Sequence, residues 1–164
     1  MNTDRIEKTV MLHASRERVW RAISSADEFG LWFGVAFKGS FAENTRMTGT
    51  IVPTTVDADV ARMQEPHAGM PFEFVVDRIE PMDRISFRWH PFAMEPGVDY
   101  SHEPMTHIVF ELEDSNGGTR LTITESGFDR IPIERRAKAF AANEGGWEHQ
   151  SQLVGKYLAL HAGA

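Results

Sequence analysis

Polar and apolar residues alternate in several stretches between residues 70 and 126, which is the pattern of half-buried β-strands. In the stretch 70–79, Phe72, Phe74 and Val76 fall on one face. The same alternation recurs in three later runs: Ile85, Phe87 and Trp89; Ile108, Phe110 and Leu112; Leu121 and Ile123. Asn116-Gly117-Gly118 is a strong hairpin turn between the last two runs. Strands joined by tight turns predict an antiparallel, strongly curved sheet.

The N-terminal region predicts a strand followed by two short helices. Residues 6–12 alternate like a strand, with Lys8 as an exception. Residues 15–25 have an apolar helical face and begin with Ser15, a residue type that caps helices. Residues 26–34 form a second short helix with Asp27 as its expected cap.

Short strands and two irregular segments follow. Strand-like pieces occupy 35–41 and 46–52. The segment 53–69 has weak helical spacing, but Pro66 and a later glycine interrupt it, so we expect a loop that covers part of the molecule. The segment 91–104 is rich in proline and is also expected to be a long loop.

The C-terminal residues, from Ile131 onward, predict a long amphipathic helix in two segments. The first segment has an apolar stripe made of Ile133, Ala137, Phe140 and Ala141. In the second segment the spacing of four, three and four residues places on one face Trp147, Ser151, Val154 and Leu158. Gly145 and Gly146 between them predict a kink or a close approach to the sheet. An apolar face this wide needs a partner surface, and the sheet is the candidate.

The order of these elements predicts an α+β fold. We expect one domain over 1–164, with a curved antiparallel sheet of about six or seven strands wrapped around the long C-terminal helix and two short helices after the first strand.

Composition narrows the classes of function. The chain has 164 residues, a net charge of −7 and no cysteine. The negative charge disfavours nucleic-acid binding, which needs clustered Lys and Arg, and the lack of cysteine excludes disulfides and thiolate metal sites. No apolar signal core or membrane-length apolar run occurs, so the expected location is the cytoplasm.

Four motifs resemble the START-like (SRPBCC, helix-grip) superfamily, and within it the family of the C-terminal domain of the activator of the ninety-kilodalton heat-shock-protein ATPase. They are Ala14-Ser15-Arg16-Glu17-Arg18-Val19-Trp20, Leu31-Trp32-Phe33, Leu121-Thr122-Ile123-Thr124-Glu125-Ser126-Gly127-Phe128, and Asn143-Glu144-Gly145-Gly146-Trp147 with Lys156-Tyr157-Leu158. The resemblance implies a cavity between sheet and helix. The co-chaperones carry a further N-terminal domain that this sequence does not contain, so chaperone activation is not expected.

The expected ligand site lies in that cavity. Its residues are either lining or plain core, and the alternation alone leaves both readings open. The ligand-binding candidates are Trp32, Phe33, Phe74, Phe87, Trp89, Phe110, Glu125 and Trp147.

Glu125 is the most informative of these residues because it continues the inward phase of Leu121 and Ile123. A buried carboxylate there would be a ligand contact, a general base, or a structural group that accepts a hydrogen bond from a Trp N–H or pairs with an Arg.

We expect neither a metal nor a cofactor. His90, His102 and His107 lie near Glu103 in sequence, but His107 is out of phase with the inward residues and no His-Glu-x-x-His run occurs.

Three functions remain open. The first is binding of a small hydrophobic or aromatic molecule, oriented by Glu125, Trp89 and Trp147 and gated by 53–69 and 91–104. The second is a cyclase or dehydratase that uses Glu125 as acid/base. The third is a protein-interaction module, through a homodimer or a partner that contacts the exposed loop Pro91-Phe92-Ala93-Met94.

Overall fold

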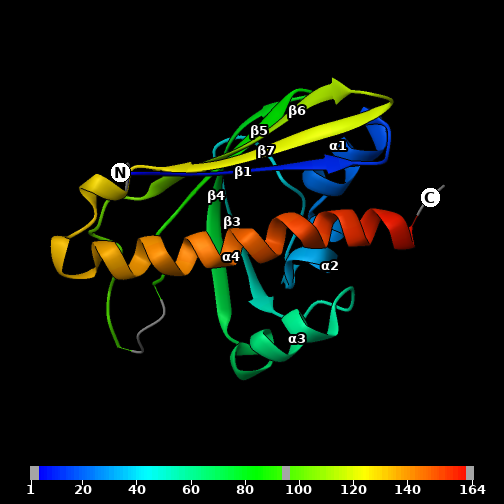
Figure 1. The fold of residues 1–164 in the computed structure, drawn as a ribbon. Coiled ribbons are helices and arrows are strands. Elements are labelled where there is room, and N and C mark those ends of the chain that lie inside the picture. The colour runs from blue at the N-terminus through cyan, green and yellow to red at the C-terminus, as the bar shows by residue number, and fades with distance from the viewer. Residues whose placement is uncertain (1–3, 94–96, 162–164) are drawn as a thin grey trace.

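The computed structural model describes residues 4–93 and 97–161, and these build one seven-stranded antiparallel sheet around a long helix (Figure 1). The strand order is β1-β7-β6-β5-β4-β3-β2. The strands are β1 (Arg5–Leu12), β2 (Val35–Phe37), β3 (Thr45–Ile51), β4 (Pro71–Glu80), β5 (Arg84–Trp89), β6 (Thr106–Ser115) and β7 (Gly118–Ser126). This confirms the expected α+β fold with a curved antiparallel sheet.

The hairpin of β6 and β7 sets the register of the central sheet. Asn116 and Gly117 both have positive φ, 43° and 82°, which suits the tight turn that this dipeptide favours. In the resulting register Phe110 pairs with Ile123 and Ile108 pairs with Glu125. All four are buried, as their alternation predicted.

Two short helices follow the first strand: α1 (Arg16–Ser24) and α2 (Ala26–Phe33). Ser15 caps α1 by accepting a hydrogen bond from the Arg18 N–H, as expected. The cap of α2 is Ser25 rather than Asp27, because the Ser25 hydroxyl accepts from the Glu28 N–H. Asp27 instead lies in the first helical turn, where a negative charge favours the helix dipole.

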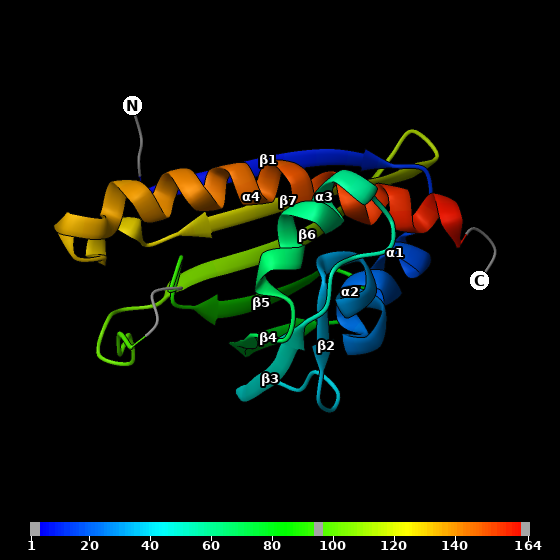
Figure 2. The same ribbon diagram turned by 90° about the horizontal axis from the view of Figure 1, so that it is seen from below.

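The helix α4 (Ile133–Leu160) is continuous for 28 residues and lies in the concave face of the sheet (Figures 1 and 2). It passes through Gly145 and Gly146 without ending, so the expected division into two segments is wrong. The four residues predicted to share a face are all buried: Trp147, Ser151, Val154 and Leu158.

The apolar stripe predicted for the first turns of α4 is wrong. Ile133 is 76% exposed, and Ala137 and Ala141 are also exposed. The buried residue in this part of the helix is Ala139, and Phe140 packs edge-on against Phe128 with ring centroids 5.2 Å apart. Figure 1 shows the cause: the first turns of α4 extend past the strand ends, so they have no sheet to cover.

The segment 53–69 is not the expected loop, since it contains α3 (Ala58–Gln64) and the short 3-10 helix η1 (Glu65–His67). The Asp57 carboxylate caps α3 by accepting from the N–H groups of Asp59 and Val60. Pro66 falls in η1, beyond the last residue of α3, so it does not interrupt the α-helix. A second 3-10 helix, η2 (Phe128–Arg130), connects β7 to α4.

The core between sheet and helices is rich in aromatic rings. Phe29 of α2 lies at its centre and contacts seven other rings within 6.0 Å: Trp32, Phe33, Phe37, Phe41, Phe74, Phe87 and Phe110. The indole N–H of Trp32 donates to the carbonyl of Ala22 at 2.9 Å, which satisfies its one polar atom. This packing fixes α2 against the sheet.

Candidate functional site

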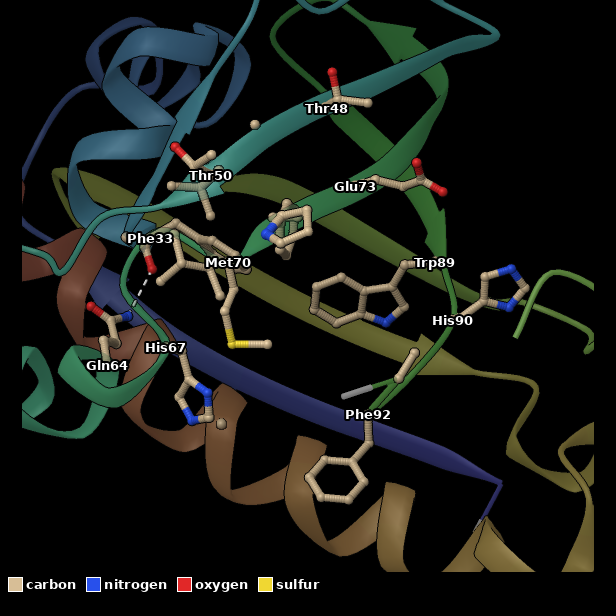
Figure 3. Close-up of a pocket in the computed structure, with 18 of the residues that line it drawn as sticks. Phe33, Thr48, Thr50, Gln64, His67, Met70, Glu73, Trp89, His90 and Phe92 are labelled. Atoms are coloured by element: carbon tan, nitrogen blue, oxygen red, sulfur yellow. Dashed lines mark hydrogen bonds between the residues drawn. The ribbon is translucent and has the colours of Figure 1, made fainter. Parts of the chain in front are cut away.

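A cavity of about 1040 Å³ lies between the sheet, α3 and α4. Its walls come from six parts of the chain: the end of α2 with β2 and Lys38, β3 and the start of β4, α3 with η1, the end of β5 with the residues after it, the segment 98–105, and one face of α4. Figure 3 shows Trp89 in the centre of this view, with Met70 and His67 on one side and Phe92 on another.

The cavity wall combines aromatic faces with separate polar groups. Its apolar side chains include Phe33, Val60, Met63, Met70, Phe72, Trp89, Phe92, Val98 and Met105. The polar ones include Thr48, Thr50, Gln64, His67, Glu73, His90, Asn143, His149 and Gln150. An apolar surface with a few polar groups is typical of a small-molecule site.

The two segments predicted to gate the site do border the cavity. α3 contributes Val60, Met63 and Gln64, and the segment after β5 contributes Phe92, Tyr100 and others. Met94, part of the predicted exposed apolar loop, lies outside the described residues.

A hydrogen-bonded clamp fixes Pro91, Phe92 and Glu103 to α4. The Arg135 guanidinium makes three hydrogen bonds to the Glu103 carboxylate, at 2.6, 2.9 and 3.1 Å. It also donates to the carbonyls of Pro91 and Phe92 and lies over the Tyr100 ring at 4.8 Å. These contacts hold one wall of the cavity on the first turns of α4.

Glu125 is 0% exposed, and donors from β5, β6 and α4 surround its carboxylate. Oε1 accepts from the Trp147 indole N–H at 2.8 Å and the Asn143 amide at 2.9 Å. Oε2 accepts from the Trp89 indole N–H at 2.7 Å, the Thr106 hydroxyl at 2.5 Å and the same Asn143 amide at 3.0 Å. Every partner is a neutral donor, so the carboxylate is satisfied without an arginine or lysine.

The Glu125 carboxylate lies behind the cavity wall, but two of its hydrogen-bond donors belong to that wall. Trp89 and Asn143 line the cavity, whereas Glu125 does not. The Trp89 ring also stacks on Trp147, with centroids 5.6 Å apart and planes at 25°. Glu125 therefore sets the position of two wall residues from behind.

The structure divides the eight predicted ligand residues into two groups. Phe33 and Trp89 line the cavity. The other six are packed in the core behind its wall: Trp32, Phe74, Phe87, Phe110, Glu125 and Trp147. Strand alternation correctly predicted that Phe74, Phe87, Phe110 and Glu125 face inward, and helical spacing did so for Trp147. Neither pattern gives the distance of a side chain from the open space.

The sequence reasoning missed the α4 wall residues. Asn143 and Gln150 stand four residues before and three after Trp147, so they share its helical face. Polar residues in phase with a buried tryptophan were the available signal.

The histidines occupy different surroundings. His107 faces away from the cavity and lies 3.1 Å from the Asp77 carboxylate. His90 lines the cavity, and burial lowers its pKa. Within 4–93 and 97–161 no group of three His, Asp or Glu side chains could hold a metal ion.

Comparison with known families identifies the family of this chain. Residues 13–159 match the family described as Activator of Hsp90 ATPase homolog 1-like protein. The chain belongs to this family. The match spans both motifs that supply Glu125 and Trp147, and the family's START-like helix-grip fold is the one observed.

Solved structures share the fold at low sequence identity. A protein from Arthrobacter aurescens is 18% identical with a TM-score of 0.72, and the match covers 99% of this chain and 91% of that one. The Aha1 dimer from Colwellia psychrerythraea is 16% identical with a TM-score of 0.67, covering 97% and 98%. DynU16, described as a putative protein in the dynemicin biosynthetic locus, is 22% identical with a TM-score of 0.66. The match covers 96% of this chain but only 48% of DynU16.

The search of curated proteins returned no match. Among the described residues, no helix is both long and apolar enough to cross a membrane.

Proposed function

We propose that this member of the Activator of Hsp90 ATPase homolog 1-like family binds a small hydrophobic or aromatic molecule in the cavity between its sheet and α4. The observation that carries the proposal is the cavity of about 1040 Å³ with the aromatic side chains of Phe33, Phe72 and Trp89 in its wall. Ligand sites in proteins typically have volumes of about 300 to 1,000 Å³ and mostly apolar walls.

The packing of Trp89 supports this proposal. Its ring is fixed from behind by the hydrogen bond to Glu125 and by stacking on Trp147. A ring that is already ordered loses little entropy when a flat ligand packs on it, so binding costs less free energy.

The cyclase or dehydratase alternative has less support because its proposed acid/base residue has no access to a ligand. A general base must lie within hydrogen-bond distance of the proton that it removes. Glu125 is fully buried, and both of its oxygens accept hydrogen bonds from protein groups.

The interaction alternative is also weaker. Its expected surface began at Pro91 and Phe92, but Pro91 is buried and Phe92 is half-buried. The structure from Colwellia psychrerythraea is described as a dimer, and a homodimer of this chain remains part of that alternative.

Binding can be tested with the neutral fluorescent probe N-phenyl-1-naphthylamine and a pair of matched variants. Ala142 lines the cavity, whereas its neighbour Ala141 is exposed and outside the wall. We expect Ala142→Phe to weaken probe binding at least several-fold and Ala141→Phe to leave it unchanged, with both variants folded by circular dichroism. Probe binding that is absent from the wild type, or equal in both variants, contradicts the proposal. Native mass spectrometry of the purified protein would reveal a retained molecule.

A further inference from the structure

Two of the three described residues with buried, unpaired side-chain polar atoms lie at the cavity. Within the described residues, buried side-chain N or O atoms without a hydrogen-bond partner occur in Arg18, His90 and Gln150. Arg18 is compensated by an ion pair with Glu28 at 2.9 Å. The other two residues, His90 and Gln150, both line the cavity. A buried polar atom without a partner is costly and calls for a physical explanation.

The orientation of the Gln150 amide is fixed, so its unpaired atom is identified as the oxygen. The Gln150 Nε2 group donates to the Phe33 carbonyl at 3.0 Å. The same carbonyl accepts from Gln64 Nε2, also at 3.0 Å (Figure 3). Turning the Gln150 amide over would set its oxygen against the Phe33 oxygen, and two acceptors repel each other. Gln150 therefore leaves Oε1, an acceptor, without a donor.

The matching glutamine on α3 shows what a satisfied side chain looks like here. Gln64 donates to Phe33 in the same way, but its Oε1 accepts from the Thr54 N–H at 2.8 Å. Gln150 makes the first of these bonds and lacks the second. The missing partner must be a donor.

We propose that the ligand of this cavity is a neutral aromatic or alicyclic molecule that carries a hydrogen-bond donor, a hydroxyl or N–H group, which it presents to Gln150 Oε1. This inference rests on the proposed binding function and specifies its ligand class. The apolar part of the molecule packs on Phe33, Phe72 and Trp89, which line the same cavity. A small side-chain adjustment, of the kind common on binding, brings Oε1 into contact with the ligand.

The same oxygen disfavours anionic ligands. A carboxylate has only acceptors and would set a negative oxygen against Gln150 Oε1. The charged side chains of the wall favour neither sign of charge, because Glu73 pairs with Arg46 at 2.7 Å and the other two, Lys38 and Asp99, have opposite charges. The unpaired oxygen of Gln150 should therefore favour alcohols and phenols over two other classes of ligand. These are carboxylic acids, and the ethers formed from the same alcohols and phenols.

A pair of ligands isolates this hydrogen bond. 2-Naphthol and 2-methoxynaphthalene share a ring system, but only the first can donate. We expect wild-type protein to bind 2-naphthol about tenfold more tightly than its methyl ether, because leaving a buried acceptor unpaired costs about one hydrogen bond. Ligand-observed NMR titration at neutral pH measures both dissociation constants, and 2-naphthoate serves as the anionic member and should bind most weakly.

The variant Gln150→Met tests the residue. The Phe33 carbonyl keeps its bond from Gln64, so the fold is expected to survive. The preference for 2-naphthol should disappear, while binding of 2-methoxynaphthalene is retained. Gln152→Met is the matched control, because Gln152 is exposed on the same helix and is not part of this cavity wall.

The outcomes separate the two proposals. The donor inference is overturned if wild-type protein binds 2-naphthol and 2-methoxynaphthalene equally well, or binds neither. It is also overturned if the preference for 2-naphthol persists in Gln150→Met. If N-phenyl-1-naphthylamine still binds in those cases, the binding function stands. If it does not bind wild-type protein either, the binding function fails as well. The ligand pair on wild-type protein decides the matter even if Gln150→Met does not fold.

Discussion

The substitution Glu125→Gln tests the hydrogen-bond network behind the cavity because it preserves size but replaces one acceptor oxygen with an NH₂ donor. The two carboxylate oxygens each accept from one indole: Oε1 from Trp147 and Oε2 from Trp89. A glutamine amide has one oxygen and one NH₂ group, so whichever way it lies, one indole N–H faces another donor. Asn143 also donates its amide hydrogens to both oxygens. Since it too is a donor here, it cannot accept from the indole that has lost its partner.

The cost follows from these contacts. A buried donor left without an acceptor costs about 1 to 3 kcal/mol, and the remaining bonds lose the strength that the negative charge gave them. The orphaned indole belongs to a side chain that is 3% exposed if it is Trp147, so water offers little relief. We expect Glu125→Gln to lower the free energy of unfolding by about 3 kcal/mol, which corresponds to roughly 6 to 12 °C in Tm for a chain of this size.

Urea unfolding followed by circular dichroism measures this loss, and a double-mutant cycle assigns it. In a Trp147→Phe background the indole N–H that faces Oε1 is absent, so a glutamine NH₂ group turned to that side meets one donor, the Asn143 amide, instead of two. We expect the cost of Glu125→Gln to fall by about 1 to 2 kcal/mol in that background. A single-variant loss below about 0.5 kcal/mol, or a cost that is the same in both backgrounds, would refute the role of the carboxylate as shared acceptor.

Three further outcomes follow from the structure. Because Arg135 ties Glu103 to α4, Arg135→Met should make residues 97–104 several-fold more sensitive to limited proteolysis, while Lys138→Met, on the exposed face, should not. Burial lowers the pKa of His90 below its ordinary value, so the folded state resists its protonation. The stability of the protein should therefore fall as the pH drops below about 6.5. In thermal unfolding, His90→Asn should weaken that pH dependence. The hydrogen bond from Lys156 lowers the pKa of Asp57 to about 2. The stabilisation from this contact is therefore complete above the ordinary pKa of an Asp side chain and disappears as the pH approaches about 2. A carboxyl-carbon NMR titration should find the lowered pKa of Asp57, and Lys156→Met should raise it.

The strand faces could be predicted from the sequence because burial follows a period of two. Phe74, Phe87, Phe110 and Ile123 are all buried as their alternation indicated. The same reasoning placed Glu125 inward, and the structural reading of a carboxylate that accepts from a Trp N–H agrees with the bond to Trp89. Local period and residue chemistry were sufficient for both results.

The cavity itself could not be predicted in this way. Strand alternation and helical spacing give the direction of a side chain but not its distance from open space. Trp147 and Phe110 therefore looked equivalent to Trp89, although of these three only Trp89 lines the cavity. The wall also needs α3, a short helix capped by Asp57, which the weak helical spacing of 53–69 did not predict. Tertiary packing at strand ends decides where a sheet and helix leave a space, and no local pattern encodes it.

The buried carboxylate has a use that stability alone does not explain. Buried charged groups can often be replaced by well-packed apolar residues with no loss of stability, whereas removing one partner of an existing network is costly. We infer that the hydrogen bonds to Glu125 also fix the position of α4 along its axis, because hydrogen bonds are more directional than apolar contacts. A shift of α4 by one residue, about 1.5 Å, would break the hydrogen bonds of Asn143 and Trp147 to Glu125. Since Gln150 stands on the same helical face, the bonds of α4 to Glu125 and the bond of Gln150 to the Phe33 carbonyl together set where that side chain meets the cavity.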